Sequence, residues 1–299
     1  MIKNGYFHSF DNTKLFYTVE GPDEETWFNR NTPKTKPTLL FCYGLVCSKL
    51  HWSYQIDYLK NQFNTIWFDY RGHHRSDFPK DPNSLTIENI AKDIEALLSE
   101  LDVQNVVLLG HSMGVNLVLE AYRRFPERIS KLVLANGTAR GPLASMFHTN
   151  IAQIVFPYLY ASHKKFPRLS KFLWKAQGNS KIVPWIIGQL GFNPHLSKPE
   201  DVELYVDMLS KLEMIVTLQL LKDYEDYDAT HWLSKIDVPT LIIAGEKDLI
   251  IPPDAQETMH QLIPNSRFEM IRNGSHCPQM DLPELINVIL ESFLKNPAE

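Results

Sequence analysis

The stretch NVVLLGHSMGVNLVLEAYRRFP (residues 105–126) joins three local patterns. Its first part, NVVLLG, is a short unbroken apolar run, which predicts a strand buried on both faces. Its last part, VNLVLEAYRRFP, has the apolar pattern of a helix and is closed by Pro126. Between them Ser112 stands in the sequence Gly-His-Ser-Met-Gly. A serine between two glycines, on a turn from a buried strand into a helix, is the G-x-S-x-G setting of an exposed nucleophile.

The same rhythm of apolar runs and helical patterns continues on both sides of this stretch. Two strands are expected within residues 5–20, around the turn signal at 11–13. Further buried strands are expected at 38–44, 65–72, 131–137, 238–248 and 266–273, and helices at 51–62, 86–102, 252–263 and 283–294. Buried strands that alternate with helices predict a mostly parallel sheet with helices on both faces and right-handed crossovers.

This rhythm is interrupted between residues 139 and 231. The segment has no buried-strand pattern and is helical and aromatic. We expect its prolines to divide it into several short helices: Pro142, Pro157, Pro167, Pro184, Pro194 and Pro199. The sequence therefore predicts an α/β core of residues 1–138 and 232–299, interrupted after its sixth strand by a helical cap of residues 139–231.

Composition narrows the class of protein. The 299 residues carry a net charge of −5, and the pI is about 6.1, which argues against nucleic acid as the main partner. The first residues lack the apolar run of a secretory signal, and no stretch approaches the ~18 apolar residues of a membrane span. Three cysteines without metal-site spacing fit reduced thiols. We expect a cytoplasmic enzyme without metal or organic cofactor, and the oligomeric state stays open.

A serine hydroxyl is a weak nucleophile and needs a base. Two titratable side chains late in the chain meet this need, because Asp248 and His276 each follow a predicted strand. The order Ser112, Asp248, His276 accompanies the G-x-S-x-G turn. All three fall where parallel strands reach their carboxyl ends, the edge at which open α/β sheets place their sites.

Five stretches together resemble the α/β-hydrolase-fold superfamily, in particular capped serine hydrolases of the carboxylesterase and lipase kind. They are FCYGL (41–45), DYRGHHRSD (69–77), GHSMG (110–114), AGEKDLIIP (244–252) and NGSHCPQMDLPE (273–284). The resemblance implies a mostly parallel eight-stranded sheet with helices on both faces and an inserted helical cap. It implies Ser112 as nucleophile, His276 as general base and then acid, and Asp248 as the group that orients the imidazole. It also implies an oxyanion hole made by the backbone N–H groups of Leu45 and Met113.

The chain departs from the common pattern of the superfamily at two places. Many members have His-Gly in the first oxyanion loop, where this chain has Tyr43-Gly44. Tyr43 either takes over the packing role of the histidine or projects its hydroxyl toward the substrate. The commoner form of the second motif has glycine at His74, and we expect His73 and His74 to belong to a structural loop rather than to touch the substrate.

The sequence also suggests roles for several other candidate residues. Tyr43, His111, Phe147 and Trp185 are expected to line the substrate pocket, although His111 is also expected to pack or to bond within its loop. Asp69 is expected to bond within the loop of Arg71, and Asp281 to cap the last helix. Asn136 cannot supply the negative charge of a triad acid, and Cys277 is the one cysteine next to a histidine. Most other aromatic side chains of the cap are expected in its core: Phe156, Tyr158, Tyr160, Phe172, Trp174, Phe192 and Tyr205.

The resulting functional hypothesis is an enzyme that cleaves a carboxylic ester of a hydrophobic small molecule or lipid-like compound. The same triad also supports acyl transfer, lactone, thioester and amide hydrolysis, carbon–carbon bond cleavage and cofactor-free peroxidase chemistry. A non-catalytic ligand receptor on the same scaffold is an alternative from a different class. A dehalogenase would need a carboxylate at position 112, so Ser112 argues against that activity.

Overall fold

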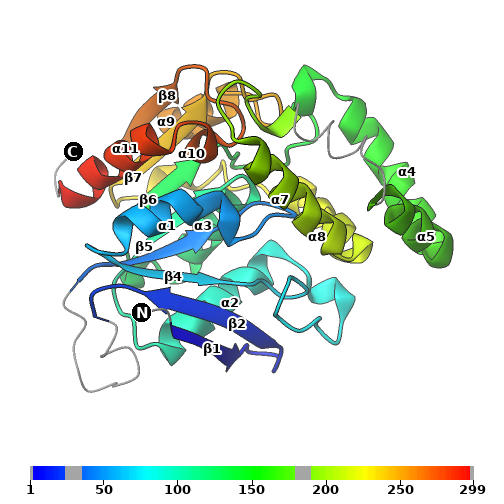
Figure 1. Ribbon diagram of the computed structural model, residues 1–299, viewed down its shortest axis with the longest axis horizontal. Coiled ribbons are helices and arrows are strands. Elements are labelled where there is room, and N and C mark those ends of the chain that lie inside the picture. Colours follow the sequence, from blue (N-terminus) through cyan, green and yellow to red (C-terminus); the bar gives the residue numbers. More distant parts are fainter. Residues whose placement is uncertain (1–2, 24–35, 179–189, 297–299) are drawn as a thin grey trace.

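The architecture was obtained as a computed structural model that describes residues 3–23, 36–178 and 190–296. Eight strands form one sheet in the order β1-β2-β4-β3-β5-β6-β7-β8, and it is parallel from β4 to β8 (Figure 1). Antiparallel pairing is confined to β1 with β2 and β2 with β4. The strands are β1 Lys3–His8, β2 Lys14–Glu20, β3 Thr38–Cys42, β4 Asn64–Phe68, β5 Val106–His111, β6 Ile129–Ala135, β7 Thr240–Gly245 and β8 Ser266–Ile271. The expected fold class is confirmed.

The helices fall into two groups. Those of the core are α1 Ser53–Leu59, α2 Ile87–Glu100, α3 Met113–Arg124, α9 Asp254–Leu262, α10 Pro278–Asp281 and α11 Pro283–Lys295. The helices between β6 and β7, here called the helical insert, are α4 Ile151–Lys165, α5 Pro167–Gly178, α7 Pro199–Lys211 and α8 Met214–Asp226. Short 3₁₀ turns are η2 Lys49–Trp52, η3 Pro82–Ser84, η4 Pro126–Arg128, η5 Met146–His148 and η6 Leu233–Lys235.

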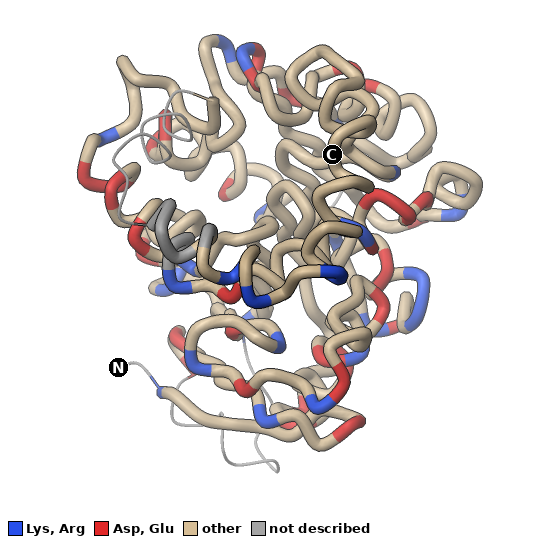
Figure 2. Tube along the Cα trace, turned by 90° about the vertical axis from the view of Figure 1, so that its right-hand side faces the viewer, with Lys and Arg blue, Asp and Glu red and all other residues tan. Residues whose placement is uncertain are grey.

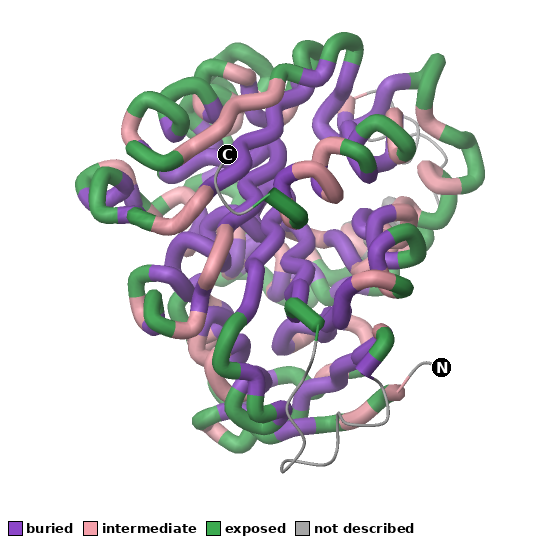
Figure 3. The backbone as a smooth tube through the Cα atoms, turned by 90° about the vertical axis from the view of Figure 1, so that its left-hand side faces the viewer, coloured by how far each residue is buried: buried purple, intermediate pink, exposed green. Residues whose placement is uncertain are grey.

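The central strands owe their burial to unbroken apolar sequence. Every residue of β3, β5 and β7 is buried, as their lack of polar alternation predicts (Figure 3). The register sets Cys42 of β3 beside Gly110 of β5, and His111 beside Ala135 of β6. The carboxyl ends of β3, β5, β6, β7 and β8 therefore meet along one edge of the sheet, and the loops that follow them gather there.

Several strands end two to four residues before the predicted limits. The sequence predicts strands through Gly44, Gly72 and Asp248, whereas β3, β4 and β7 end at Cys42, Phe68 and Gly245. The residues after each strand leave the ladder to form the loops at the carboxyl edge. Burial does not mark this change, since Tyr43, Asp69 and Asp248 are buried although they lie beyond the strand ends.

Pro157 was expected to divide two helices, and this expectation is wrong. The residue lies inside α4, which continues from Ile151 to Lys165. Proline removes a single backbone donor and its ring crowds one carbonyl, a cost that flanking packing can offset. On the inner face of α4, Phe156 joins a small apolar cluster with Leu143 and Met214.

No helix in the described part of the chain is both long and apolar enough to span a bilayer.

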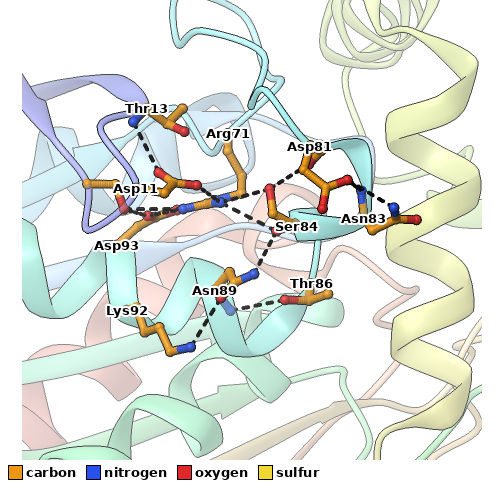
Figure 4. A network of polar contacts seen from close by, with 11 residues as sticks. Asp11, Thr13, Arg71, Asp81, Asn83, Ser84, Thr86, Asn89, Lys92 and Asp93 are labelled. Atoms are coloured by element: carbon orange, nitrogen blue, oxygen red, sulfur yellow. Dashed lines mark hydrogen bonds and ion pairs between the residues drawn. The ribbon is translucent and has the colours of Figure 1, made fainter.

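A buried ionic network ties the β1–β2 turn, the loop after β4 and helix α2 together (Figure 4). The Arg71 guanidinium is fully buried and binds both carboxylate oxygens of Asp93, with N–O distances of 2.8 and 2.6 Å. It also donates to Asp11 at 2.9 Å and to Ser84 Oγ at 3.2 Å. The Ser9 hydroxyl donates to Asp93 as well. Arg71 therefore has a structural role in anchoring the loop that follows β4.

Candidate active site

Ser112 lies on the turn between β5 and α3 in a strained backbone conformation. Its φ is 56° and its ψ is −126°, a region that residues with a side chain rarely adopt. A Cβ atom at Gly110 would lie 2.5 Å from the Gly114 carbonyl oxygen, and one at Gly114 would lie 2.5 Å from the Cys42 carbonyl oxygen. Both glycines are therefore required by close backbone approach, which accounts for the G-x-S-x-G spacing.

Three side chains from three separate loops form one hydrogen-bonded chain. The His276 Nε2 atom is 3.0 Å from Ser112 Oγ, and His276 Nδ1 is 2.9 Å from Asp248 Oδ2. The other carboxylate oxygen of Asp248 accepts the backbone N–H groups of Ile250 and Ile251 at 2.8 and 2.9 Å. These two bonds fix the orientation of the carboxylate. Its Oδ2 atom accepts the Nδ1–H of His276, which directs Nε2 of the imidazole toward the serine.

Asn136 is a member of this site whose role the sequence did not indicate. Its side-chain amide donates to Asp248 Oδ2 at 2.8 Å and to the Ser275 carbonyl at 3.1 Å. Its φ of 48° is one that asparagine tolerates better than most residues. Its residue type alone indicates only that Asn136 cannot be the acid. Its place at the end of β6, next to the strand that carries Asp248, was the available signal.

Two further histidines surround His276. His111 Nε2 donates to the His276 carbonyl at 2.8 Å, and the His111 ring stacks on His51 with centroids 5.7 Å apart. Burial, and then the neighbouring His276, lower the pKa of His51 to about 3. Burial, and then the neighbouring His276 and His51, lower the pKa of His111 well below its usual value. Both rings are therefore neutral, and His111 holds the loop of His276 in place.

Tyr43 occupies a packing position. The side chain is fully buried, its hydroxyl accepts the backbone N–H of Tyr70 at 3.0 Å, and the two rings stack with centroids 4.0 Å apart. In return the Tyr70 hydroxyl donates to the Tyr43 carbonyl at 3.0 Å. Tyr43 is not among the residues that line the cavity above Ser112. The expectation that it belongs to the substrate pocket is thus wrong, and its alternative role in packing fits these contacts.

A cavity of about 270 Å³ lies above Ser112 and His276. Of the expected pocket residues, His111 and Phe147 line it, and Trp185 lies outside the described residues. Most of the remaining wall is apolar: Leu45, Val46, Met146, Leu190, Gly191, Phe192, Leu221, Ile250 and Ile251. His51, Cys47, Tyr205, Thr217, Tyr224 and Cys277 complete it. The sequence pattern had not indicated His51 or the α8 residues among these.

The two expected oxyanion-hole residues lie on either side of Ser112. Met113 is the first residue of α3, so its N–H group has no partner within the helix. Leu45 lines the cavity and follows Gly44. A Cβ atom at Gly44 would lie 2.8 Å from the Ser112 Cβ. Glycine at this position therefore lets the backbone that carries the Leu45 N–H come close to the serine.

Three of the competing residues have other tasks. Asp69 accepts from the Arg75 side chain at 3.0 Å, within the loop where it was expected to bond. Asp281 does not cap the last helix, since its carboxylate accepts the backbone N–H groups of Ser275 at 2.7 Å and Asn193 at 3.1 Å. It therefore joins the loop of His276 to the helical insert. Burial raises the pKa of the Cys277 thiol well above its ordinary value, which disfavours a thiolate nucleophile.

The aromatic residues of the helical insert divide into three groups. Phe156 is buried in the insert, as expected. Phe192 and Tyr205, which were also expected in its core, line the cavity. Tyr158 and Phe172 are not in the core of the insert, because their exposed fractions are 73% and 68%. The expectation that most insert aromatics are core residues is therefore wrong for these two.

Comparison with known proteins agrees with this architecture. A family model described as alpha/beta hydrolase fold matches residues 37–283. Epoxide hydrolase 3 of Xenopus tropicalis is 26% identical over 313 residues, covering 98% of this chain and 78% of the relative. Bifunctional epoxide hydrolase 2 of Sus scrofa is 25% identical over 288 residues and 88% of this chain. The match covers 52% of that relative, so the chain spans about half its length.

A thermophilic esterase from Thermogutta terrifontis has the same fold, with a TM-score of 0.79, 20% identity, and coverage of 99% of this chain and 100% of that chain. At this identity the likeness shows the fold alone. The family match, by contrast, spans the turn of Ser112 and the loops of Asp248 and His276. The chain therefore belongs to the alpha/beta-hydrolase-fold family.

Proposed function

We propose that the protein is a serine hydrolase that cleaves carboxylic esters of hydrophobic small molecules through an acyl-enzyme. The observation that carries this proposal is the hydrogen-bonded chain from Ser112 through His276 to Asp248 at the floor of a mostly apolar cavity. Hydrolysis of this general kind is what the family supports, and the ester substrate is our inference from the site.

In the first half of the reaction, Ser112 Oγ attacks the carbonyl carbon of the ester while His276 Nε2 takes the hydroxyl proton. The negative charge that develops on the carbonyl oxygen would be stabilised by the N–H groups of Leu45 and Met113. The tetrahedral intermediate then loses the alkoxide, which receives the proton from His276. The acyl group is left on Ser112 as an ester.

In the second half, water attacks the acyl carbon and gives a proton to His276. The bond from the acyl carbon to Ser112 Oγ breaks, the serine regains its proton, and the carboxylic acid leaves. Asp248 keeps the Nδ1 proton of His276 in place and stabilises the imidazolium in both halves. The amide of Asn136 and the two backbone N–H groups hold that carboxylate.

The names of the relatives raise epoxide hydrolysis as a second candidate. Attack of Ser112 on an epoxide carbon would open the ring and leave an ether between the serine and the substrate. An ether has no carbonyl carbon for water to attack, so the enzyme would be alkylated and would not turn over. Attack on a carboxylic ester gives a new ester, which water can cleave. A serine at position 112 therefore favours acyl chemistry.

The cavity wall indicates the kind of acyl or alcohol group that would fit. Leu221, Ile250 and Phe192 contribute apolar surface, and the volume of about 270 Å³ lies at the lower end of the range for small-molecule sites. A short or medium hydrophobic group is therefore expected to be favoured over a long chain.

The test uses the purified protein, a fluorophosphonate probe, and p-nitrophenyl esters from acetate to dodecanoate, with Ser112→Ala beside the parent. We expect the probe to label the parent and the ester turnover to fall by about 10⁴-fold or more in the variant, because the nucleophile is lost. Equal melting temperatures would show that the variant is folded.

Turnover retained in Ser112→Ala would refute the nucleophile assignment. Labelling without release of p-nitrophenol would favour acyl transfer or another acyl substrate. A protein that binds small hydrophobic ligands tightly but is neither labelled nor active would support the receptor alternative. Turnover of an epoxide by the parent would contradict the choice of acyl chemistry.

A further inference from the structure

Helices α4 and α5 form a hairpin at one end of the molecule (Figure 1). Its inner side packs through Phe156 and Tyr160 against residues of α8. Its outer side carries an exposed apolar stripe. Five residues of α4 at the helical spacing of three and four are exposed: Ile151 62%, Ile154 56%, Val155 53%, Tyr158 73% and Leu159 46%. Phe166, Leu169 and Phe172 extend it onto α5, with exposed fractions of 54%, 57% and 68%.

The same hairpin is basic in an acidic protein. Residues 128–199 contain ten Lys and Arg and no Asp or Glu, whereas the whole chain has a net charge of −5. Within the hairpin the cations are Lys164, Lys165, Arg168, Lys171 and Lys175. Figure 2 faces this end of the molecule and marks the basic residues in blue.

Most of the described cations are available to a partner. Lys164, Lys165 and Arg168 are exposed, and none of them is paired with a carboxylate in the described part of the chain. Lys171 is paired with Glu213 of the helical insert at 3.0 Å. The Lys164 and Lys165 ammonium groups lie 5.1 and 5.4 Å from the ring centres of Tyr160 and Phe166. Lys164 therefore lies next to a residue of the inner side, and Lys165 lies next to Phe166 of the stripe, at the end of α4.

We propose that the outer face of the α4–α5 hairpin docks on an anionic lipid surface. An exposed apolar stripe with aromatic residues, close to exposed lysine and arginine that have no carboxylate partner among the described residues, matches the two attractions that hold a helix in a bilayer interface. The apolar side chains enter the boundary between headgroups and acyl chains, and the cations remain at the anionic headgroups. A second copy of the same face is disfavoured, because two such hairpins would bring like charges together.

The segment that leads into the hairpin forms part of the wall of the candidate active site. Met146 and Phe147 line that cavity, and α4 begins shortly after them at Ile151. Docking would therefore hold the cavity close to a source of hydrophobic substrates. The proposal itself concerns binding and does not depend on hydrolysis.

The test is co-sedimentation with vesicles of phosphatidylcholine alone or of an equal mixture with phosphatidylglycerol. We expect binding to the anionic vesicles, little binding to the neutral ones, and loss of binding at about 0.5 M NaCl, where the Debye length is about 4 Å. Lys164→Gln/Lys165→Gln/Arg168→Gln should bind about 100-fold more weakly, because each cation near such a surface is worth about a factor of five. Its matched control, Lys80→Gln/Lys235→Gln/Lys247→Gln, makes the same charge change elsewhere and should bind as the parent does.

The apolar contribution has its own pair of variants. Ile154→Ser/Leu159→Ser should weaken vesicle binding by about 10-fold or more, since two buried side chains are lost. Leu285→Ser/Val288→Ser makes a similar change on the exposed face of α11 and should have no effect. Melting temperatures and the Ser112→Ala protein, which should bind vesicles like the parent, keep this result separate from folding and from hydrolysis.

Absence of binding to anionic vesicles would overturn the proposal. Binding that ignores the charge of the lipid, or that survives both hairpin variants, would overturn it as well. A dimer that is dissolved by Ile154→Ser/Leu159→Ser, in a protein that does not bind vesicles, would assign the surface to a second copy instead.

Discussion

At the scale of single residues, the site depends on backbone positions that only a few side chains can occupy. Ser112 has a positive φ, and its two flanking glycines lie against neighbouring backbone. Such strain persists only when the surroundings determine the conformation, which here are the ends of β5 and β3 and the start of α3. The fixed serine then needs little rearrangement to reach His276.

Asn136 provides a prediction at this scale. Asn136→Asp would place a second carboxylate within hydrogen-bond distance of Asp248, where the amide now donates at 2.8 Å. Two like charges at this distance disfavour the ionised form, so one of them would hold a proton and the orientation of His276 would suffer. We expect kcat for ester hydrolysis to fall by roughly 10- to 100-fold at pH 7.

The matched control is Asn136→Gly. Glycine adopts the φ of 48° without strain but has no side-chain amide. It should lose less activity than Asn136→Asp, since it adds no charge. Equal losses in the two variants would mean that the missing amide, rather than the added carboxylate, determines the effect.

The sequence could predict that Ser112, Asp248 and His276 lie close together, because each has a positional signal. Ser112 lies in a spaced glycine motif, and Asp248 and His276 each follow an apolar run. Asn136 has a weaker signal, its place directly after the strand β6, and this does not distinguish it from the amides of many loops. His51 has no positional signal, because buried imidazoles occur in many loops. Tyr43 was ambiguous, since a tyrosine can pack or point into a cavity, and only the contacts with Tyr70 distinguish the two roles.

At the scale of secondary-structure elements, the Arg71 network joins a turn, a loop and a helix. The guanidinium and the Asp93 carboxylate have no exposed side-chain surface. Asp93→Ala would leave a buried cation without its main partner, so we expect the free energy of unfolding to fall by about 3–5 kcal/mol. Urea unfolding of the variant and the parent would measure this.

Two further variants define the origin of that loss. Replacing both partners, Arg71→Met/Asp93→Leu, should restore much of the stability, because an apolar pair needs no compensation. Asp57→Ala, which breaks the exposed pair with Lys60, should change stability by less than about 1 kcal/mol. A small effect of Asp93→Ala would show that the network is relaxed by water and does not anchor α2.

The elements themselves were predictable where periodicity was strong. The helix expected at 86–102 is observed at Ile87–Glu100, and Thr86 accepts from the Asn89 N–H as its N-terminal cap. Pro157 was misjudged, because the rule that proline ends helices does not include the packing of the inner side of α4, through Phe156 and Tyr160. Strand ends were misjudged because the sequence does not show where the backbone leaves the ladder: the segments predicted as strands include the first loop residues, such as 69–72 and 246–248.

At the scale of the whole molecule, several imidazoles are buried in neutral form. Burial is the main cause that lowers the pKa of His73 to about 3, and the pKa of His51 is lowered to a similar value. The unfolded chain protonates each of these histidines near pH 6.5, whereas the folded protein does not. The free energy of unfolding is therefore highest above pH 6.5. It falls as the pH decreases toward 3, by about 1.4 kcal/mol per pH unit for each histidine.

This predicts that the melting temperature falls between pH 7.5 and pH 5. His73→Gln is expected to be less stable than the parent at pH 7.5, since it loses the contact with the Arg71 carbonyl. Between these two pH values the free energy of unfolding of His73→Gln should fall by about 2 kcal/mol less than that of the parent, because one titrating group is gone. His8→Gln, at an exposed position, is the control for removal of an imidazole. Parallel pH profiles of His73→Gln and the parent would refute the neutral assignment of His73.

The overall architecture was the most predictable level, because the repetition of strand and helix over the chain averages local errors. What the sequence did not indicate is the outer surface of the helical insert. Aromatic residues in a segment with helical spacing suggest a core, and the sequence does not say which of two faces is covered. Tyr158 and Phe172 were therefore assigned to the wrong side.

The basic hairpin has a practical consequence for the way the molecule behaves in an electric field or on a charged matrix. A pI of about 6.1 describes the average over the chain, but the α4–α5 hairpin contains five Lys and Arg and no Asp or Glu. At neutral pH a negatively charged column therefore meets a molecule that is anionic as a whole and cationic at the end it presents. We expect retention on such a matrix to depend on the orientation of the molecule more than on its net charge. We also expect the protein to approach a polyanion with the hairpin first.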